Sequence, residues 1–281
     1  MNKTQAWLLA ARPKTLPAAL APVVLSQAMA FAGGPASITL ALVIAACALG
    51  LQIAVNLAND LFDFQRGVDT GARLGPARAA QSGWLSLAEL RLGLALVLVL
   101  TVFAGLWLVV QGGWPFFWLG VASVLALLAY SGGPLPLAAC GLGEVAVFLF
   151  FGLLAVAGSY YLQAHTLPAD VWLAAVQMGC LTAAIMLVNN IRDRESDRRG
   201  GRFTLAIALG ERGSRMLYAL LLLLPFALLP LRTLSRLALI PALLLIFFIY
   251  RRSGTALNRQ LAQTALLCLL FALLRAADFV I

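Results

Sequence analysis

The chain has 281 residues, of which 62% are apolar and only 11% are charged. Because a soluble domain carries about a quarter charged residues, this composition excludes a water-soluble fold and indicates a protein that crosses a membrane several times. The net charge of +9 does not indicate a nucleic-acid partner, since the basic residues gather in alternate loops, a pattern that sets membrane orientation.

Nine apolar segments are predicted to be membrane-spanning helices, because a helix satisfies its own backbone polar groups in lipid. Glycine- and proline-rich turns separate several of them, including residues 33–35 and 131–136. We therefore expect one all-α polytopic membrane domain over residues 1–281. The predicted helices cover residues 16–32, 38–58, 92–110, 115–130, 143–162, 171–188, 216–231, 237–250 and 261–281.

The basic residues indicate how these helices cross the membrane. An odd number of helices places the two chain ends on opposite sides. A cytoplasmic N-terminus then puts most of the 20 lysines and arginines in cytoplasmic segments, as the positive-inside rule requires. We therefore expect a multi-pass protein with a cytoplasmic N-terminus. The polar ends of the second and sixth predicted helices lie on that same side.

Two polar stretches close the second and sixth predicted helices in the same way. The first acidic block is residues 56–69, and the second acidic block is residues 189–199. In each block, Asn or Asp recurs four residues apart, which places the side chains on one face of a helix. We expect the blocks to face each other across a cavity. The pairs are Asn56 and Asp60, Asn59 and Asp63, and Asp193 and Asp197, with Asn189 one turn before Asp193.

Carboxylate and amide oxygens of this kind suit Mg²⁺, which binds one or two carboxylates and completes its shell with water and phosphate oxygens. Ionisable groups at a membrane boundary are costly and tend to mark a site. The plainer alternative is that each block is a solvated helix end whose aspartates pair with nearby arginines. Because both blocks share one pattern, we predict a Mg²⁺-diphosphate site on the cytoplasmic side.

Basic and apolar residues around the blocks fit the same chemistry. Arg78, in a Gly- and Pro-rich loop, and Arg202 are candidates for contacts with diphosphate oxygens, and Lys14 is a further one. Each is alternatively an ordinary cytoplasmic loop charge. The apolar helices provide a groove for a polyprenyl tail and a site where water cannot quench an allylic cation. Candidates for contacts with the acceptor or the prenyl chain are Asn56, Tyr130 and Asn189.

On these motifs the chain resembles the UbiA superfamily of intramembrane aromatic prenyltransferases. Within it, the chain is most similar to the 1,4-dihydroxy-2-naphthoate polyprenyltransferases of menaquinone synthesis. The resemblance covers nearly the whole chain. It includes residues 11–17, 52–69, 75–83, 132–137, 141–144 and 158–163, and it continues from the second acidic block to Gly210.

The resemblance implies a bundle of nine transmembrane helices around a central cavity that opens to membrane lipid, in a bacterial cytoplasmic (inner) membrane. It implies transfer of a polyprenyl chain from polyprenyl diphosphate to 1,4-dihydroxy-2-naphthoate. The donor ionises with help from Mg²⁺, diphosphate and CO₂ are lost, and demethylmenaquinone results. The metal-binding and catalytic residues that it implies are Asn59, Asp60, Asp63, Asp193 and Asp197.

The chain departs from the family pattern at three positions. Gly67 stands where the broader superfamily often has an aspartate, and the acid appears instead at Asp69. Arg202 replaces the lysine that is usual in the naphthoate branch, and the two side chains are not equivalent. Ala208 replaces a basic residue, so one charge is missing that would contribute to diphosphate or acceptor recognition.

Three alternative functions stay open, one of which is a catalytically silent structural or assembly protein of the membrane. The acceptor is alternatively another aromatic acid, such as 4-hydroxybenzoate, with the same donor chemistry. An alternative that is not an enzyme is a membrane transporter, in which polar residues would form an ion path near the bilayer midplane. Both acidic blocks lie at helix ends on one side, which favours the enzyme.

Overall fold

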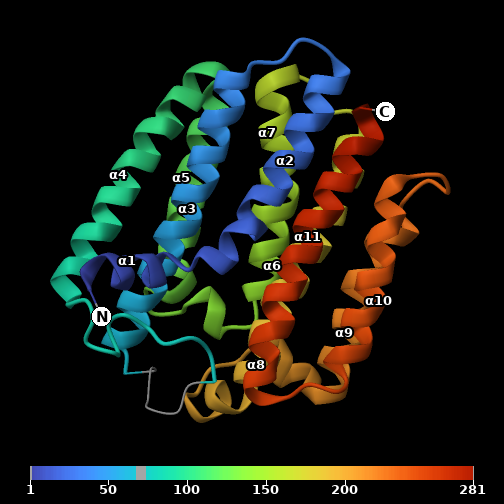
Figure 1. Ribbon diagram of the computed structural model, residues 1–281. Coiled ribbons are helices and arrows are strands. Elements are labelled where there is room, and N and C mark those ends of the chain that lie inside the picture. Colours follow the sequence, from blue (N-terminus) through green and yellow to red (C-terminus); the bar gives the residue numbers. More distant parts are fainter. Residues whose placement is uncertain (1, 68–73, 281) are drawn as a thin grey trace.

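The computed structural model describes residues 2–67 and 74–280. Its long helices run side by side, and the N- and C-termini lie at opposite ends of the bundle (Figure 1). Each of the predicted segments corresponds to a helix, so the all-α prediction is confirmed. Asp69, the acid that follows Gly67, lies outside the described residues.

The bundle begins with a short helix, α1 (Lys3–Ala11), that leads into the long ones. Four short 3₁₀ turns connect elements: η1 (Pro13–Thr15), η2 (Leu137–Ala139), η4 (Leu234–Ala238) and η5 (Gly254–Ala256). The long elements are α2 (Leu16–Gly33), α3 (Ile38–Gln65), α4 (Leu87–Gly112), α5 (Trp114–Ser131), the continuous run of α6 (Gly143–Val147), the π-helix η3 (Phe148–Leu154) and α7 (Ala155–Ala164), then α8 (Ala169–Arg199), α9 (Leu205–Ala227), α10 (Leu239–Ile249) and α11 (Leu257–Val280).

Seven helical segments within the described ranges are long and apolar enough to cross a membrane. They contain α2, α3, α4, α5, the run from α6 to α7, α8 and α11. The other two predicted spans correspond to α9, whose first half carries charged residues, and to the shorter apolar segment Leu234–Ile249. The chain is therefore a multi-pass membrane protein, and the predicted count of nine spans holds approximately.

The predicted helix ends at both acidic blocks are wrong, and so is the predicted start of the seventh helix, because α9 begins at Leu205 and not at residue 216. The sequence predicts that the second and sixth helices end at residues 58 and 188. Instead, α3 continues to Gln65 and α8 continues to Arg199. Hydropathy reports which residues prefer lipid, whereas a helix continues as long as its backbone bonds and side-chain partners are available. Residues 56–65 of the first block and all of the second block are therefore helical, and the four-residue spacing places side chains on common faces.

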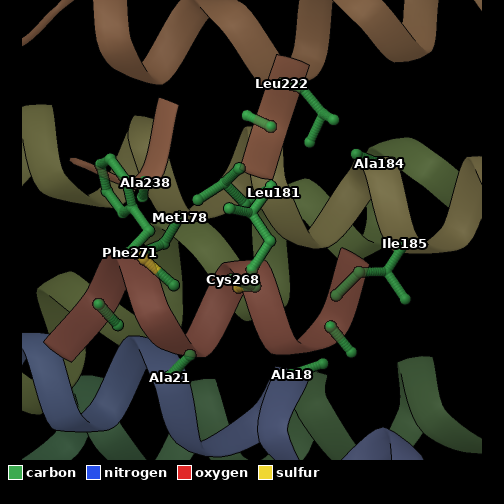
Figure 2. Close-up of a cluster of buried hydrophobic side chains, with 14 of the residues drawn as sticks. Ala18, Ala21, Met178, Leu181, Ala184, Ile185, Leu222, Ala238, Cys268 and Phe271 are labelled. Carbon is green, nitrogen blue, oxygen red and sulfur yellow. The ribbon is translucent and has the colours of Figure 1, made fainter. Parts of the chain in front are cut away.

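Helix α8 lies at the centre of the larger hydrophobic core, where it packs against α7, η3, α9 and α11. Close contact with η3 depends on two glycines, because a Cβ on Gly152 would lie only 2.3 Å from the Cα atom of Gly179. This packing fixes the position of the acidic end of α8. Side chains of this core drawn in Figure 2 include Ala18, Met178, Leu181, Ile185, Leu222, Cys268 and Phe271.

Candidate active site

A cavity of about 970 Å³ lies inside the bundle, between α2, α3, α4, α5, η3, α7 and α8. Side chains of both acidic blocks line it, so the structure brings together two stretches that are far apart in the sequence. The remainder of the wall is mainly apolar. The charged residues and asparagines that line it are Arg12, Lys14, Asn56, Asn59, Asp63, Arg78, Asn189, Asn190, Arg192, Asp193, Asp197, Arg202 and Asn258.

Asp60 is the one predicted metal ligand that does not line the cavity. Its side chain is 2% exposed and accepts hydrogen bonds from the backbone N–H groups of Ala79, at 2.9 Å, and Ala80, at 3.3 Å. Asp60 therefore holds the loop that carries Arg78 against α3. Its neighbours at helical spacing, Asn59 and Asp63, line the cavity instead.

Asp63 binds two arginines that come from different parts of the chain. Arg78 donates to its Oδ2 at 2.6 Å and also to the backbone carbonyl of Asn59. Arg202 donates to its Oδ1 at 2.5 Å and reaches Asp197 Oδ1 at 3.4 Å. A single guanidinium therefore links the first acidic block to the second. Asp63, Arg78 and Asp197 are all buried, so water screens these interactions little.

Backbone contacts place Arg202 between the two blocks. The Arg202 N–H donates to the carbonyl of Asp197 at 2.9 Å, and the Phe203 N–H donates to the carbonyl of Ala139 at 2.9 Å. Burial alone would lower the pKa of the Arg202 guanidinium, but the carboxylates of Asp63 and Asp197 outweigh it and raise this pKa above its ordinary value. Arg202 is therefore a permanent cation at this point.

Arg192 is a site residue that the sequence analysis missed. It is 6% exposed and forms a two-bonded ion pair with Asp193, at 2.8 and 2.5 Å. It also donates to the side-chain oxygens of Asn189 and Asn258, at 2.8 Å each. The signal that would have identified it is its position inside a helical Asn/Asp repeat, where a loop charge is not expected.

The predicted amide and phenol candidates also have partners. Ser131 donates to Asn59 Oδ1 at 2.6 Å, and the Tyr130 hydroxyl donates to the Met186 sulfur at 3.0 Å. Asn56 donates to the carbonyl of Ala11 at 2.9 Å, so its amide ties α3 to the end of α1. Asn59, Tyr130 and Asn56 all line the cavity, but Asn56 is mainly engaged in holding the N-terminal segment.

Lys14, a predicted diphosphate contact, and Ala208, which replaces a basic residue of the family pattern, lie in different parts of the structure. Lys14 is exposed and lines the cavity from η1, the segment before α2. Ala208 is exposed in the first turn of α9 and is not among the residues that line the cavity. The Ala208 side chain itself is therefore not part of the cavity wall.

The donor set suits a hard divalent cation in its chemistry, since it consists of carboxylate and amide oxygens only. Within residues 2–67 and 74–280, however, three or more acidic, histidine or cysteine side chains do not converge on one point. The carboxylates of Asp63, Asp193 and Asp197 are instead paired with arginines. Binding of Mg²⁺ here requires that these guanidinium groups turn toward an anion such as diphosphate.

The wall formed by α6, η3 and α7 keeps one face toward the cavity over its whole length. In an α-helix, four residues turn through about 40° more than one full turn. Side chains spaced four residues apart therefore rotate progressively away from the cavity along the helix. A π-helix holds more residues per turn and reduces this rotation. The π-helical segment Phe148–Leu154 thus keeps the stripe in place. Its members are Ala146, Val147, Phe150, Phe151, Leu154, Ala155, Gly158, Ser159 and Leu162.

A charged end and a long apolar wall within one membrane-embedded cavity define a site for an amphiphile with an anionic head. The model of the UbiA prenyltransferase family matches residues 19–274, and the chain belongs to that family. The resemblance to the UbiA superfamily, which the sequence motifs indicated, is therefore confirmed.

The chain is also similar in sequence to individual relatives and similar in fold to solved structures. The chain is 40% identical over 229 residues to the 1,4-dihydroxy-2-naphthoate octaprenyltransferase of Escherichia coli, covering 79% of this chain and 74% of the relative. It is 37% identical over 230 residues to the enzyme of the same name from Haemophilus influenzae, with the same coverage. A UbiA homolog from Archaeoglobus fulgidus, solved bound to GPP and Mg²⁺, superimposes with a TM-score of 0.66 at 19% identity, covering 98% of this chain and 100% of that one. That likeness shows the fold.

Proposed function

We propose that this protein transfers a polyprenyl group from polyprenyl diphosphate to 1,4-dihydroxy-2-naphthoate, with loss of diphosphate and CO₂. The product is the reduced form of demethylmenaquinone. The observation that carries the proposal is the Arg202 guanidinium, which contacts Asp63 and Asp197 at the charged end of an otherwise apolar cavity. The names of the relatives at 37% and 40% identity support the choice of acceptor.

The diphosphate of the donor would bind at the charged end. Asn59, Asp63, Asp193 and Asp197 supply oxygens that would hold Mg²⁺, which when bound neutralises the charge of the leaving diphosphate. Arg78 and Arg202 already lie against Asp63, and on substrate binding they would donate charge-assisted hydrogen bonds to diphosphate oxygens. Asp60 acts indirectly, by holding the Arg78 loop. Lys14 adds a further cation on the cavity wall.

The apolar wall would accommodate the prenyl tail and exclude water from the allylic carbon. The α6–α7 wall presents aromatic and aliphatic side chains, including Phe150 and Phe151, along this part of the cavity. Bond cleavage leaves an allylic cation beside the diphosphate, and the electron-rich ring of the acceptor attacks it. The ring then regains aromaticity as its carboxylate departs as CO₂. Positioning and electrostatic stabilisation provide most of the catalysis.

The proposed location is the bacterial cytoplasmic (inner) membrane, with the charged end of the cavity on the cytoplasmic side. The distribution of lysines and arginines supports this orientation. Charged groups gather at one end of the cavity and its remainder is mainly apolar, which argues against an ion path through the midplane.

The test is a turnover assay with purified protein in liposomes that contain polyprenyl diphosphate, Mg²⁺ and one aromatic acid. Prenylated naphthoquinol with equimolar CO₂ from dihydroxynaphthoate, abolished by EDTA, supports the proposal. Product from 4-hydroxybenzoate alone would keep the mechanism and change the acceptor. If folded protein forms no prenylated product with either acid, the proposed function is wrong.

A further inference from the structure

Glu144 is a buried acid that the proposed mechanism does not yet use. It lies in the first turn of α6 and is 4% exposed. Its Oε1 accepts a hydrogen bond from the Asn190 side-chain amide at 2.8 Å. Its Oε2 is buried and has no hydrogen-bond partner in the described part of the chain. A buried carboxyl group with half of its hydrogen bonds missing destabilises a fold, so its presence calls for a functional reason.

The contact with Glu144 determines which way the Asn190 amide points. A carboxylate can only accept, so Asn190 must turn its Nδ2 toward Glu144. Its Oδ1 is then on the other arm of the amide, and within the described ranges no protein group donates to it. Asn190 lines the cavity. The pair therefore fixes Asn190 Oδ1 as a hydrogen-bond acceptor at that point of the wall.

The surroundings of Asn190 suit a flat aromatic ring. Tyr130 and Met186 line the cavity beside it, and their hydroxyl and sulfur are in contact at 3.0 Å. A Cβ on Gly143, the residue before Glu144, would lie 3.6 Å from the Tyr130 hydroxyl and 3.9 Å from Asn190 Nδ2, so these groups form one patch. Sulfur and aromatic edges pack favourably against ring systems.

The patch lies one helical turn from the charged end. Met186, Asn190 and Asp193 follow one another on α8 at spacings of four and three residues, so they share a face of that helix. A ring held on the patch is therefore next to the carboxylates of the second acidic block, where the donor carbon would be released. This is the position that the acceptor of a prenyl transfer must occupy.

We propose that Glu144 is a positioning residue, which fixes Asn190 so that its Oδ1 accepts a hydrogen bond from a hydroxyl group of the aromatic acceptor. Tyr130, Met186 and Asn190 form the acceptor subsite. This inference rests on the proposed function and adds to it the place of the acceptor and the reason for selecting a hydroxylated ring. A site that offers a fixed hydrogen-bond acceptor discriminates against a ring that lacks the matching hydroxyl group.

A binding experiment tests the pair without relying on turnover. Dihydroxynaphthoate and 2-naphthoate, which lacks both hydroxyl groups, are titrated into the full-length protein in detergent by calorimetry. We expect the wild type to bind dihydroxynaphthoate at least about 10-fold more tightly than 2-naphthoate. In Glu144→Gln, the amide of Asn190 can turn either way, so this preference should fall to about 2-fold or less while 2-naphthoate binds as before.

Three further variants separate positioning from general damage. Asn190→Ala should lose the same preference, and Glu144→Gln combined with Asn190→Ala should be no worse than Asn190→Ala alone, because both act through one contact. Gln177→Leu is the matched control, since Gln177 is a buried amide on the same helix that donates to the Pro225 carbonyl and does not line the cavity. It should retain the full preference.

Turnover of the same variants distinguishes this inference from the proposed function. Glu144→Gln should raise the KM for the aromatic acid by about 10-fold and leave the KM for polyprenyl diphosphate within 2-fold. Equal loss of affinity for both naphthoates, or equal rises of both KM values, would show that Glu144 only supports the cavity wall, and the inference would be wrong. If the wild type binds dihydroxynaphthoate selectively but forms no product, the subsite stands and the proposed function does not.

Discussion

Arg202 donates a hydrogen bond to Asp63 at 2.5 Å, although 139 positions separate the two residues in the sequence. The contact joins the end of α3 to the loop after α8, and Asp197 completes it from the second acidic block. The carboxylates thus meet cations of the protein at the place where a divalent metal and diphosphate would bind. Substrate binding at this site is therefore expected to exchange protein ion pairs for contacts with metal and phosphate.

Asp63→Asn and Asp193→Asn should each lower turnover by roughly 100-fold or more, because each removes a charge that would hold Mg²⁺ beside the leaving group. The fold should survive, since the core around α8 is not altered. Turnover and thermal melting in detergent measure the two effects. Asp170→Asn is the control, because Asp170 is exposed in the first turn of α8, at the end opposite Asp193. Wild-type turnover in either site variant would remove that residue from the metal site.

Arg202→Lys should be tolerated better than Arg202→Gln. Lysine keeps the charge but gives up the two-pronged contact with Asp63 and Asp197, so we expect turnover to fall by about 10-fold, against roughly 100-fold or more for glutamine. The KM for polyprenyl diphosphate should account for part of each loss. Equal activity of the two variants would mean that the charge at this position does not contribute.

The pH dependence of this contact follows from the raised pKa of Arg202. A cation whose pKa is raised by folding adds stability that is complete below its unfolded pKa and is lost as pH rises through its folded pKa. For arginine both values lie above any practical assay, so Arg202 contributes no pH dependence to the wild type. In Arg202→Lys, a decline at high pH should appear, since lysine ordinarily titrates near about 10.4. Activity measured from neutral to strongly alkaline pH compares the two proteins.

The sequence predicted the apolar helices and the helical spacing within the acidic blocks, because apolar segment length and four-residue spacing are local properties. It did not predict where the helices end at the two blocks. It could not predict which block residues face the cavity. Asn59 and Asp60 are adjacent, so their side chains differ in direction by about 100° around the helix, and the spacing does not say which one points inward. Only the packing of α3 decides that Asp63 faces the cavity and Asp60 faces the loop. The partners of Arg192 and Glu144 depend on tertiary contacts in the same way.

Asp60→Ala should act through the Arg78 loop and not through the metal. Loss of the carboxylate leaves the N–H groups of Ala79 and Ala80 without their partner, so unfolding should become easier by about 1–3 kcal/mol. The KM for polyprenyl diphosphate should rise, because Arg78 is no longer held beside Asp63. The Mg²⁺ concentration that gives half-maximal rate should change little.

Asp63→Asn is the comparison for that measurement, since Asp63 lines the cavity and Asp60 does not. It should raise the half-maximal Mg²⁺ concentration strongly. If Asp60→Ala raises it as much as Asp63→Asn does, then Asp60 binds the metal directly, and the indirect role argued for it is wrong.

Gly152→Ala should weaken the packing between η3 and α8. The new methyl group would lie 2.3 Å from the Cα atom of Gly179, and backbone cannot move aside as a flexible side chain can. We expect a loss of about 1–3 kcal/mol, seen as a lower melting temperature, together with weaker use of long polyprenyl donors because the stripe of the α6–α7 wall shifts. Gly120→Ala is the matched control, since Gly120 is likewise a glycine within a helix, in α5, and a Cβ there meets no atom within 4 Å. Equal melting temperatures for the two variants would mean that the close approach of η3 and α8 is not required.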